Sequence, residues 1–519
     1  MTCRIVIFLV ICYTPIYAAS PQSAIEWLNI TAGSTQVAAK SEKNTQEVST
    51  SNTVIQKTEL KTLNFNGIGV IPSEISGINS KIWLQIDQSL LASLIESLPT
   101  LQFYNAKSFF KRLLISETDP PKVLDPEERQ EIYLLARIDR LIGMGALDEA
   151  EELIHQVRPL SKEIFRRWKK IALLGGRLTK LCKELIKTPN LSDDASLRVV
   201  CFAKLGDLDT ATLVLSTAAS LRIIDEKKEA LLVYHLDPQF IQINEVKNLS
   251  SKFDELEFYL LDQANILETT QALGKPYLYR KLNKNSFAER IYAAEQLTIS
   301  QAINGSKLFE LYRSSYRDIS NGPEQLALLF ELDEALRKPN KIALRNQLVQ
   351  AISKMYNMRL INPFAEEYAL RLAELDMSAY DKKLNDMCMK LFLLDGTIPR
   401  KWQSFSTTDP YLETAFNLLK ESELTLNHIS NFFELIDPSL ASHEGIKKRD
   451  FLIQVLASPR EKERSGQFLL KALHLSSQGQ GTEPDDFLRA LLILKSINES
   501  QLAKSIMIEY LVNLSHQET

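Results

Sequence analysis

The chain has 519 residues, of which 45% are hydrophobic and 24% are charged, a composition typical of folded globular proteins. Its 65 acidic and 61 basic residues give a formal net charge of −4, which argues against a nucleic-acid partner held by phosphate neutralisation. The length allows about two to four domains, and no stretch beyond the N-terminus is apolar enough to predict a membrane span.

Residues 1–19 have the layout of a secretory signal. Arg4 precedes the apolar run Ile5–Tyr13, and small residues follow it. The run is too short to cross a membrane, so we expect cleavage after Ala18 or Ala19 and a mature protein that is periplasmic or secreted. A lipoprotein signal at Cys12 is the alternative, but the preceding residue is a large isoleucine where a small residue is needed.

The rest of the chain divides by composition. Residues 20–61 are rich in Ser, Thr, Asn, Gln, Lys and Glu and offer little to bury, so we expect a disordered polar linker. Residues 62–78 predict an extended lead-in in which Pro72 opposes a helix. Helical periodicity begins near Asn79, and we assign residues 79–250 to helical repeats, 251–394 to a helical region and 395–519 to a C-terminal helical region.

A repeated turn organises the helical part. Within Glu131–Val157, apolar residues recur at helical spacing on both sides of Gly143-Met144-Gly145, which predicts two helices folded back on each other. Gly176 lies 31 residues after Gly145, and Gly206 lies another 30 residues on. Leucine stands two residues after each of these glycines, and alanine stands five residues after the first and the third: Leu147, Leu178 and Leu208; Ala150 and Ala211.

The copies GALDEA and GDLDTA, which begin at Gly145 and Gly206, resemble the middle of a tetratricopeptide repeat, where glycine, a large residue and alanine mark the turn. The resemblance covers Glu131–Ala219 and includes only the turn portion of the repeat. It implies a short α-solenoid of stacked helix pairs that presents a groove to a protein or peptide. A plain helical bundle with similar turns is the alternative. As a whole, the chain resembles exported bacterial helical-repeat proteins.

Helical periodicity continues to the C-terminus, and no run of strands with a period of two is long enough to build a sheet, so the predicted fold class is all-α. Leu273–Asn285 is interpreted as a loop, and Ser286 with Glu289 as a capping box that opens the next helix. Other helices are expected at Phe253–Leu267, Pro323–Leu336, Ile342–Tyr356, Pro363–Leu375, Leu384–Leu394, Leu412–Lys420, Phe451–Ala457, Gly466–Leu475, Phe487–Ile497 and Gln501–Leu514.

The sequence contains none of the common catalytic or nucleotide-binding motifs HExxH, GxSxG, GxxxxGK[ST], GxGxxG and CxxC. The six histidines are too scattered to suggest a metal site. We therefore expect a non-enzymatic protein with no catalytic residue, metal or cofactor. The alternative is a cell-wall glycan-cleaving enzyme with a helical superhelix, because Glu421-Ser422 matches a pair that such enzymes use. The glycine-rich context of their sugar cleft is missing, so we interpret this pair as a helix terminus.

Signal cleavage leaves three cysteines, Cys182, Cys201 and Cys388, which is too few for a disulfide framework. Cys182 and Cys201 lie on successive predicted helices and could form a disulfide in an oxidising compartment. Two buried thiols are the interpretation we favour, because unpaired cysteine is commonly buried.

A cluster of aromatic and basic residues is the candidate partner-binding site: Tyr277, Tyr279, Arg280, Lys281 and Lys284. Tyrosine and arginine contribute strongly to binding energy, and loops on a rigid helical frame commonly carry recognition. We therefore expect these residues to bind an acidic partner in the cell envelope, either a protein or peptide or an anionic polymer. Packing of the tyrosines on the next helix is the alternative, and the concave face of the repeats would then be the next candidate. The sequence does not determine the oligomeric state.

Overall fold

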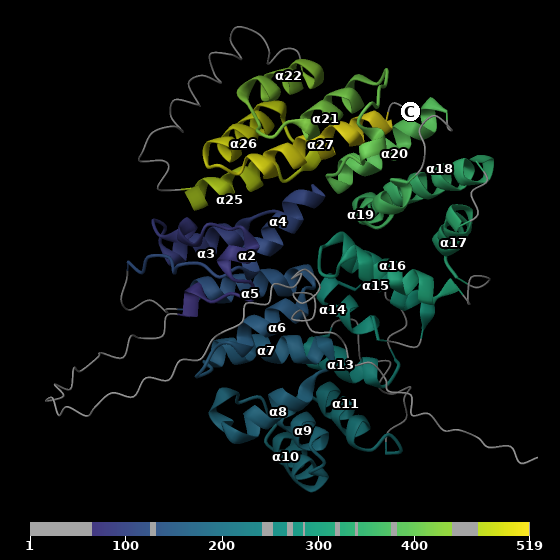
Figure 1. The fold of residues 1–519 in the computed structure, drawn as a ribbon. Helices are drawn as coiled ribbons and strands as arrows, with labels where there is room; N and C mark the ends of the chain where they lie inside the picture. The colour runs from purple at the N-terminus through teal and green to yellow at the C-terminus, as the bar shows by residue number, and fades with distance from the viewer. Residues whose placement is uncertain are drawn as a thin grey trace, which may run out of the picture. The chain divides into compact units, whose positions relative to one another are not determined.

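The computed structural model describes residues 65–124, 131–240, 253–266, 273–283, 286–316, 322–337, 341–374, 381–437 and 465–517. These residues form α-helices and short 3-10 turns (Figure 1), and none of them lies in a β-strand. The all-α prediction is confirmed. The expected signal peptide, the polar linker and the helix Phe451–Ala457 lie outside the described residues.

The predicted extended lead-in contains two helical turns, η1 (Phe65–Gly67) and α2 (Ser73–Ser76), so this prediction is wrong in part. Pro72 stands at the N-cap of α2. It opens the helix rather than opposing it, because the first turn of a helix does not need the backbone N–H that proline lacks. Three further elements follow: η2 (Ser80–Trp83), α3 (Gln88–Ser97) and α4 (Tyr104–Ile115).

Three helix pairs occupy the repeat region: α5 (Ile132–Met144) with α6 (Leu147–His155), α7 (Lys162–Gly175) with α8 (Leu178–Lys187), and α9 (Ala195–Lys204) with α10 (Leu208–Ser220). The turns lie at Gly145, Gly176 and Gly206, as predicted. All three glycines have positive φ, a conformation that glycine adopts without steric cost. Ala150 and Ala211 are fully buried, which fits close contact between paired helices.

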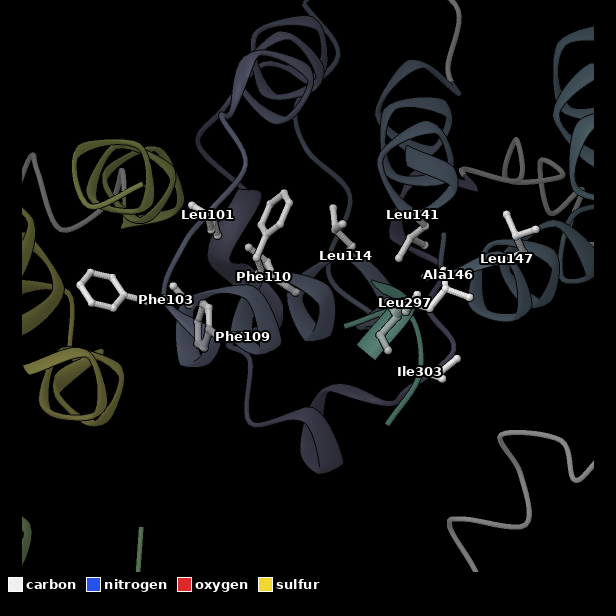
Figure 2. Close-up of a cluster of buried hydrophobic side chains, with 14 of the residues drawn as sticks. Leu101, Phe103, Phe109, Phe110, Leu114, Leu141, Ala146, Leu147, Leu297 and Ile303 are labelled. Carbon is white, nitrogen blue, oxygen red and sulfur yellow. The ribbon is translucent and has the colours of Figure 1, made fainter. Parts of the chain in front are cut away.

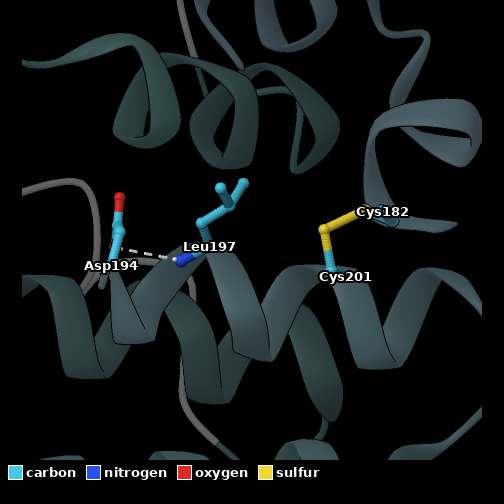
Figure 3. The surroundings of a disulfide bond; sticks show 4 residues. All are labelled: Cys182, Asp194, Leu197 and Cys201. Atoms are coloured by element: carbon cyan, nitrogen blue, oxygen red, sulfur yellow. Dashed lines mark hydrogen bonds between the residues drawn. A yellow bond between two sulfur atoms is a disulfide. The ribbon is translucent and has the colours of Figure 1, made fainter. Parts of the chain in front are cut away.

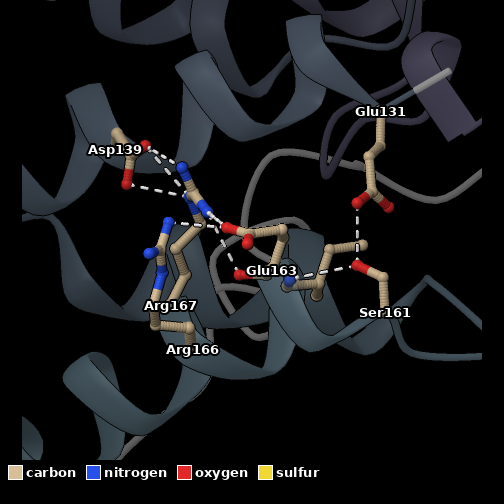
Figure 4. Close-up of polar contacts among 7 residues, drawn as sticks. Glu131, Asp139, Ser161, Glu163, Arg166 and Arg167 are labelled. Carbon is tan, nitrogen blue, oxygen red and sulfur yellow. Dashed lines mark hydrogen bonds and ion pairs between the residues drawn. The ribbon is translucent and has the colours of Figure 1, made fainter. Parts of the chain in front are cut away.

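Consecutive pairs are joined by polar contacts as well as by apolar packing. The guanidinium of Arg167 on α7 donates from Nε to both carboxylate oxygens of Asp139 on α5, each at 3.0 Å (Figure 4). Ser161 caps α7 by accepting a hydrogen bond from the N–H of Ile164, and its hydroxyl donates to Glu131 at 2.8 Å. These contacts fix the angle at which α7 follows the first pair.

The next three helices pack in turn against α9, α7 and α5, the first helix of each pair, in the reverse of their sequence order. They are α11 (Glu226–Leu236), α13 (Glu255–Gln263) and α14 (Lys275–Lys281). α11 contacts α9, α13 contacts α7, and α14 contacts both α7 and α5. The face formed by α5, α7 and α9 is therefore packed against the chain's own helices.

The remaining described elements follow the predicted helices within a few residues, and two helices, α16 and α22, were not predicted. Ser286 is the N-cap of α15, but its side chain makes no cap hydrogen bond, so the predicted capping box is wrong. The elements are α15 (Phe287–Ile299), α16 (Gly305–Ser314), α17 (Glu324–Arg337), α18 (Lys341–Asn357), α19 (Ile361–Leu372), α20 (Lys382–Asp395), η6 (Arg400–Trp402), α21 (Pro410–Lys420), α22 (Leu426–Ile436), α25 (Ser465–Leu475), η8 (Gly479–Gly481), α26 (Pro484–Ser496) and α27 (Ser500–Gln517).

The C-terminal helices pack against the N-terminal ones: α27 contacts α4, and α25 contacts α3 and η2. Phe103, just before α4, stacks on Phe487 of α26 with ring centroids 5.8 Å apart. Figure 2 shows Phe103 pointing toward the yellow C-terminal helices, while Phe110 and Leu114 lie on the side of α5. One hydrophobic core thus links the two ends of the described chain.

The start of α4 is capped from the far end of the sequence. The buried carboxylate of Glu509 on α27 accepts hydrogen bonds from the backbone N–H groups of Tyr104 (2.7 Å) and Asn105 (3.2 Å). Burial raises the pKa of Glu509, and these hydrogen bonds lower it only in part. A carboxylate at a helix N-terminus also interacts favourably with the helix dipole, so this contact stabilises the packing of α27 against α4.

Candidate functional site

The segment predicted as a partner-binding loop is the helix α14, so the loop assignment is wrong. Pro276 occupies the first turn of α14, where proline is well tolerated. Tyr279, Arg280 and Lys281 are buried, and Tyr277 is half-buried. Lys284 lies outside the described residues. Because the side chains of Tyr279, Arg280 and Lys281 face the interior of the chain, they do not form an exposed surface for a partner.

The two buried cations of α14 are paired inside the molecule. The Arg280 guanidinium forms an ion pair with Asp262 of α13. The Lys281 ammonium lies 3.1 Å from the other oxygen of Asp262 and 3.5 Å from Glu289 of α15. The positive charges that suggested an acidic partner are therefore neutralised by acids of the same chain.

Tyr279 connects α14 to the repeat turns. Its hydroxyl donates to Asp148 at 2.7 Å, and the guanidinium of Arg177 lies over its ring. Burial and then the charge of Asp148 raise the pKa of Tyr279, so the hydroxyl stays a donor. Burial alone would raise the pKa of Asp148, but attraction to Arg177 and the bonds from Tyr279 and Arg177 hold it below its usual value. These contacts anchor α14 to the starts of α6 and α8.

The glycine turns of the repeats also serve as contact points for α14 and α15. A Cβ atom on Gly145 would come within 2.6 Å of Leu297 Cδ2 and 3.2 Å of the Lys275 carbonyl oxygen. A Cβ atom on Gly176 would meet the Arg280 guanidinium. The face formed by α5, α7 and α9 is thus filled by helices of the same chain.

Cys182 on α8 and Cys201 on α9 form a disulfide, with their Cα atoms 4.9 Å apart (Figure 3). The preference for two buried thiols is wrong here, because the two helices pack closely enough to bring both side chains face to face. Asp194 caps the start of α9 by accepting a hydrogen bond from the N–H of Leu197. Cys388 remains a buried thiol, and burial raises its pKa to about 12.

The disulfide should contribute measurably to stability. It closes a loop with a sequence separation of 19, for which the loss of chain entropy in the unfolded state gives about 3 kcal/mol. We expect reduction of the wild-type protein to lower its free energy of unfolding by that amount in urea denaturation. The Cys182→Ser, Cys201→Ser double variant is the control, since reductant should leave it unchanged. A wild-type protein that denatures identically with and without reductant would reject the bond.

The enzyme alternative requires a pocket with converging free carboxylates. A cavity of about 180 Å³ lies between α20, α21 and α27, with Asp395, Lys504 and Glu509 in its lining. This is below the roughly 300 Å³ of typical ligand pockets. Glu509 accepts three hydrogen bonds, and Lys504 donates to the carbonyls of Leu419 and Glu421. Glu509 and Lys504 are thus occupied by structural contacts.

The Glu421-Ser422 pair lies on the surface at the end of α21, where Glu421 is the C-cap residue. The interpretation of this pair as a helix terminus is confirmed.

Among the described residues, no group of three or more His, Cys, Asp or Glu side chains is arranged to hold a metal ion. No described helix combines the length and apolar character needed to cross a membrane.

The outer face of α10 is the most apolar exposed feature of the repeats. Leu213 is 66% exposed, and Leu221 and Ile223 in the following turn are 65% and 61% exposed. α10 packs mainly on α9 and α11, and no charged residue occurs between Thr210 and Leu221. Leu208 is also exposed, although the equivalent Leu147 and Leu178 are buried.

The hydroxyl groups on this face of α10 are partly satisfied within the helix. They donate to backbone carbonyls of the same helix, so that only their oxygens remain available, as acceptors, at the surface. The four residues are Thr212, Ser216, Thr217 and Ser220. The sequence signal for this face was the absence of charge from Thr210 to Leu221 in a chain that is 24% charged.

Comparison with known proteins does not identify a relative: no protein-family model, no curated protein and no solved structure matches the chain.

Proposed function

We propose that the protein is an exported, non-enzymatic scaffold of the cell envelope that binds a protein partner through the outer face of α10. The observation that carries this proposal is the exposure of Leu213, Leu221 and Ile223 on and beside a helix that has no charged residue from Thr210 to Leu221. The TPR-like turns add support, since helical repeats commonly serve as frames for protein binding.

The exposed apolar side chains of α10 favour a role in partner binding. The last element of a helical-repeat stack usually has a polar outer face, because it has no neighbour to cover it. α10 instead presents large apolar side chains there, and burying each of them against a partner would contribute about 1.5–3 kcal/mol. A partner that offers an apolar helix or groove fits this face.

Two independent features support export. Residues 1–19 have the layout of a secretory signal, which is removed as the protein crosses the membrane. The Cys182–Cys201 disulfide is typical of proteins in oxidising compartments such as the periplasm or the extracellular space.

The test replaces Leu213 by glutamate, which places a charge at the centre of the α10 face. We expect the wild-type protein to recover a specific partner from envelope extract, and the Leu213→Glu variant to recover at least tenfold less, since a buried unpaired charge costs several kcal/mol. The matched control is Leu370→Glu on α19, where the leucine is 76% exposed and far along the chain from α10.

The control should recover as much partner as wild type, and all three proteins should have the same helical circular dichroism spectrum. Equal recovery by wild type and Leu213→Glu would contradict binding through α10. Equal loss in both variants would show that added negative charge, rather than this face, weakens the association.

A further inference from the structure

The outer face of α8 carries three lysines at helical spacing: Lys180, Lys183 and Lys187, here called the α8 ridge. All three are exposed, whereas the opposite face of the helix is buried in the core. Residues three and four apart share one side of a helix, so the three ammonium groups project together over about 10 Å of its length.

The ridge lysines differ from the lysines of the preceding helix. On α7, Lys162 pairs with Asp193, Lys169 with Asp194 and Lys170 with Glu255. None of the ridge lysines takes part in an ion pair or hydrogen bond within the part of the chain that the structure describes. Glu184 shares this side of α8, four residues after Lys180 and three before Lys187, but it forms no ion pair with either lysine within the described residues. The ridge is therefore a local net positive charge, in a chain whose net charge is −4.

The disulfide fixes α8, and with it the ridge, through the buried face of the helix. Cys182 lies between Lys180 and Lys183 in sequence but on the buried face of α8, and its bond to Cys201 ties the helix to α9. A surface that is already ordered loses less conformational entropy when a ligand binds.

We propose that the α8 ridge binds a carboxylate-rich segment of the protein partner, an inference that rests on the proposed scaffold function and adds the charge of that partner. Complementary charge favours this occupant. A membrane surface is less suited, because binding in a lipid interface needs an apolar face. The apolar face of α8 is buried, and Ile186 is the large apolar side chain that remains exposed on this helix.

The experiment uses the purified mature protein and a fluorescein-labelled oligoglutamate peptide as a generic acidic probe. The ridge variant is Lys180→Gln, Lys183→Gln, Lys187→Gln. The matched control is Lys81→Gln, Lys383→Gln, Lys471→Gln, which removes the same charge from three exposed lysines on separate elements. Fluorescence anisotropy at low and high salt reports binding, and vesicles containing phosphatidylglycerol form a second arm.

We expect the peptide to bind wild type and the control with affinities within twofold of each other, and the ridge variant at least tenfold more weakly. High salt should weaken the wild-type complex, because exposed charges are screened. Equal weakening in both triple variants would overturn the proposal, as would binding to vesicles without binding to the peptide. The Leu213→Glu variant should still bind the peptide, so failure of the ridge and failure of the α10 face are distinguishable.

Discussion

Replacing Arg137 by methionine is expected to lower the free energy of unfolding by about 3–5 kcal/mol. Arg137 of α5 is fully buried and donates hydrogen bonds to the carbonyls of Leu114 (2.6 Å), Ile68 (2.7 Å) and Ser116 (3.1 Å). Methionine keeps the apolar stem but has no donor, so three carbonyls would lose their partner in a site that water does not reach. Urea denaturation followed by circular dichroism measures the change.

Arg140 on the same helix supplies the control for this prediction. It is partly exposed and donates to the carbonyls of Leu98 and Pro99 near the surface, where water can replace it. The Arg140→Met variant should therefore lose only about 1 kcal/mol. Equal losses in the two variants would mean that Arg137 does not hold the lead-in and the end of α4 together.

Replacing Asp262 by alanine should have an effect of similar size, about 3–5 kcal/mol, because it removes the shared partner of two buried cations. Arg280 and Lys281 would then remain in the interior of the protein without the carboxylate that neutralises them. The same urea titration measures the loss. The dependence of the free energy of unfolding on urea concentration should be as steep as in wild type. An unchanged slope means that the variant alters stability and not the surface exposed on unfolding.

Glu289 provides the comparison. It also lies near the Lys281 ammonium, but it is partly exposed and more distant, at 3.5 Å. The Glu289→Ala variant should lose less than about 1 kcal/mol, as exposed ion pairs usually do. If Asp262→Ala is no more harmful than Glu289→Ala, α14 is not held against the repeats by this buried cluster.

The turns of the repeats could be predicted because their chemistry is local. A left-handed residue between two helices strongly favours glycine, so Gly145, Gly176 and Gly206 mark the turns without reference to the rest of the chain. The all-α class followed in the same way from helical periodicity.

The partner site could not be predicted in the same way, although one signal for α14 was present. Pro276 follows Gly274 and Lys275, and proline in this position favours the first turn of a helix as much as it favours a loop. Whether Arg280 and Lys281 face water or the interior depends on Asp262, which the intervening chain brings into contact. Burial of charge is set by such distant partners.

Other structural contacts join residues that are still farther apart in sequence. Glu509 caps the helix that begins at Tyr104, and Arg137 binds carbonyls of the lead-in and of the last turn of α4. No periodicity connects these positions, because each contact exists only after the helices have packed. The exposed face of α10 was also missed. Its leucines have the spacing expected of a buried helix, and their exposure depends on which helices pack against α10.

Site-specific photo-crosslinking tests most directly whether the partner binds the outer face of α10 while α14 fills the face of the first helices. A photoreactive amino acid is placed at Leu213 on α10 or at Tyr277 on α14 in the full chain. We predict an adduct with the partner from position 213, and only crosslinks within the chain from position 277, which packs against Phe258. An adduct with the partner from position 277 and none from position 213 would contradict this account.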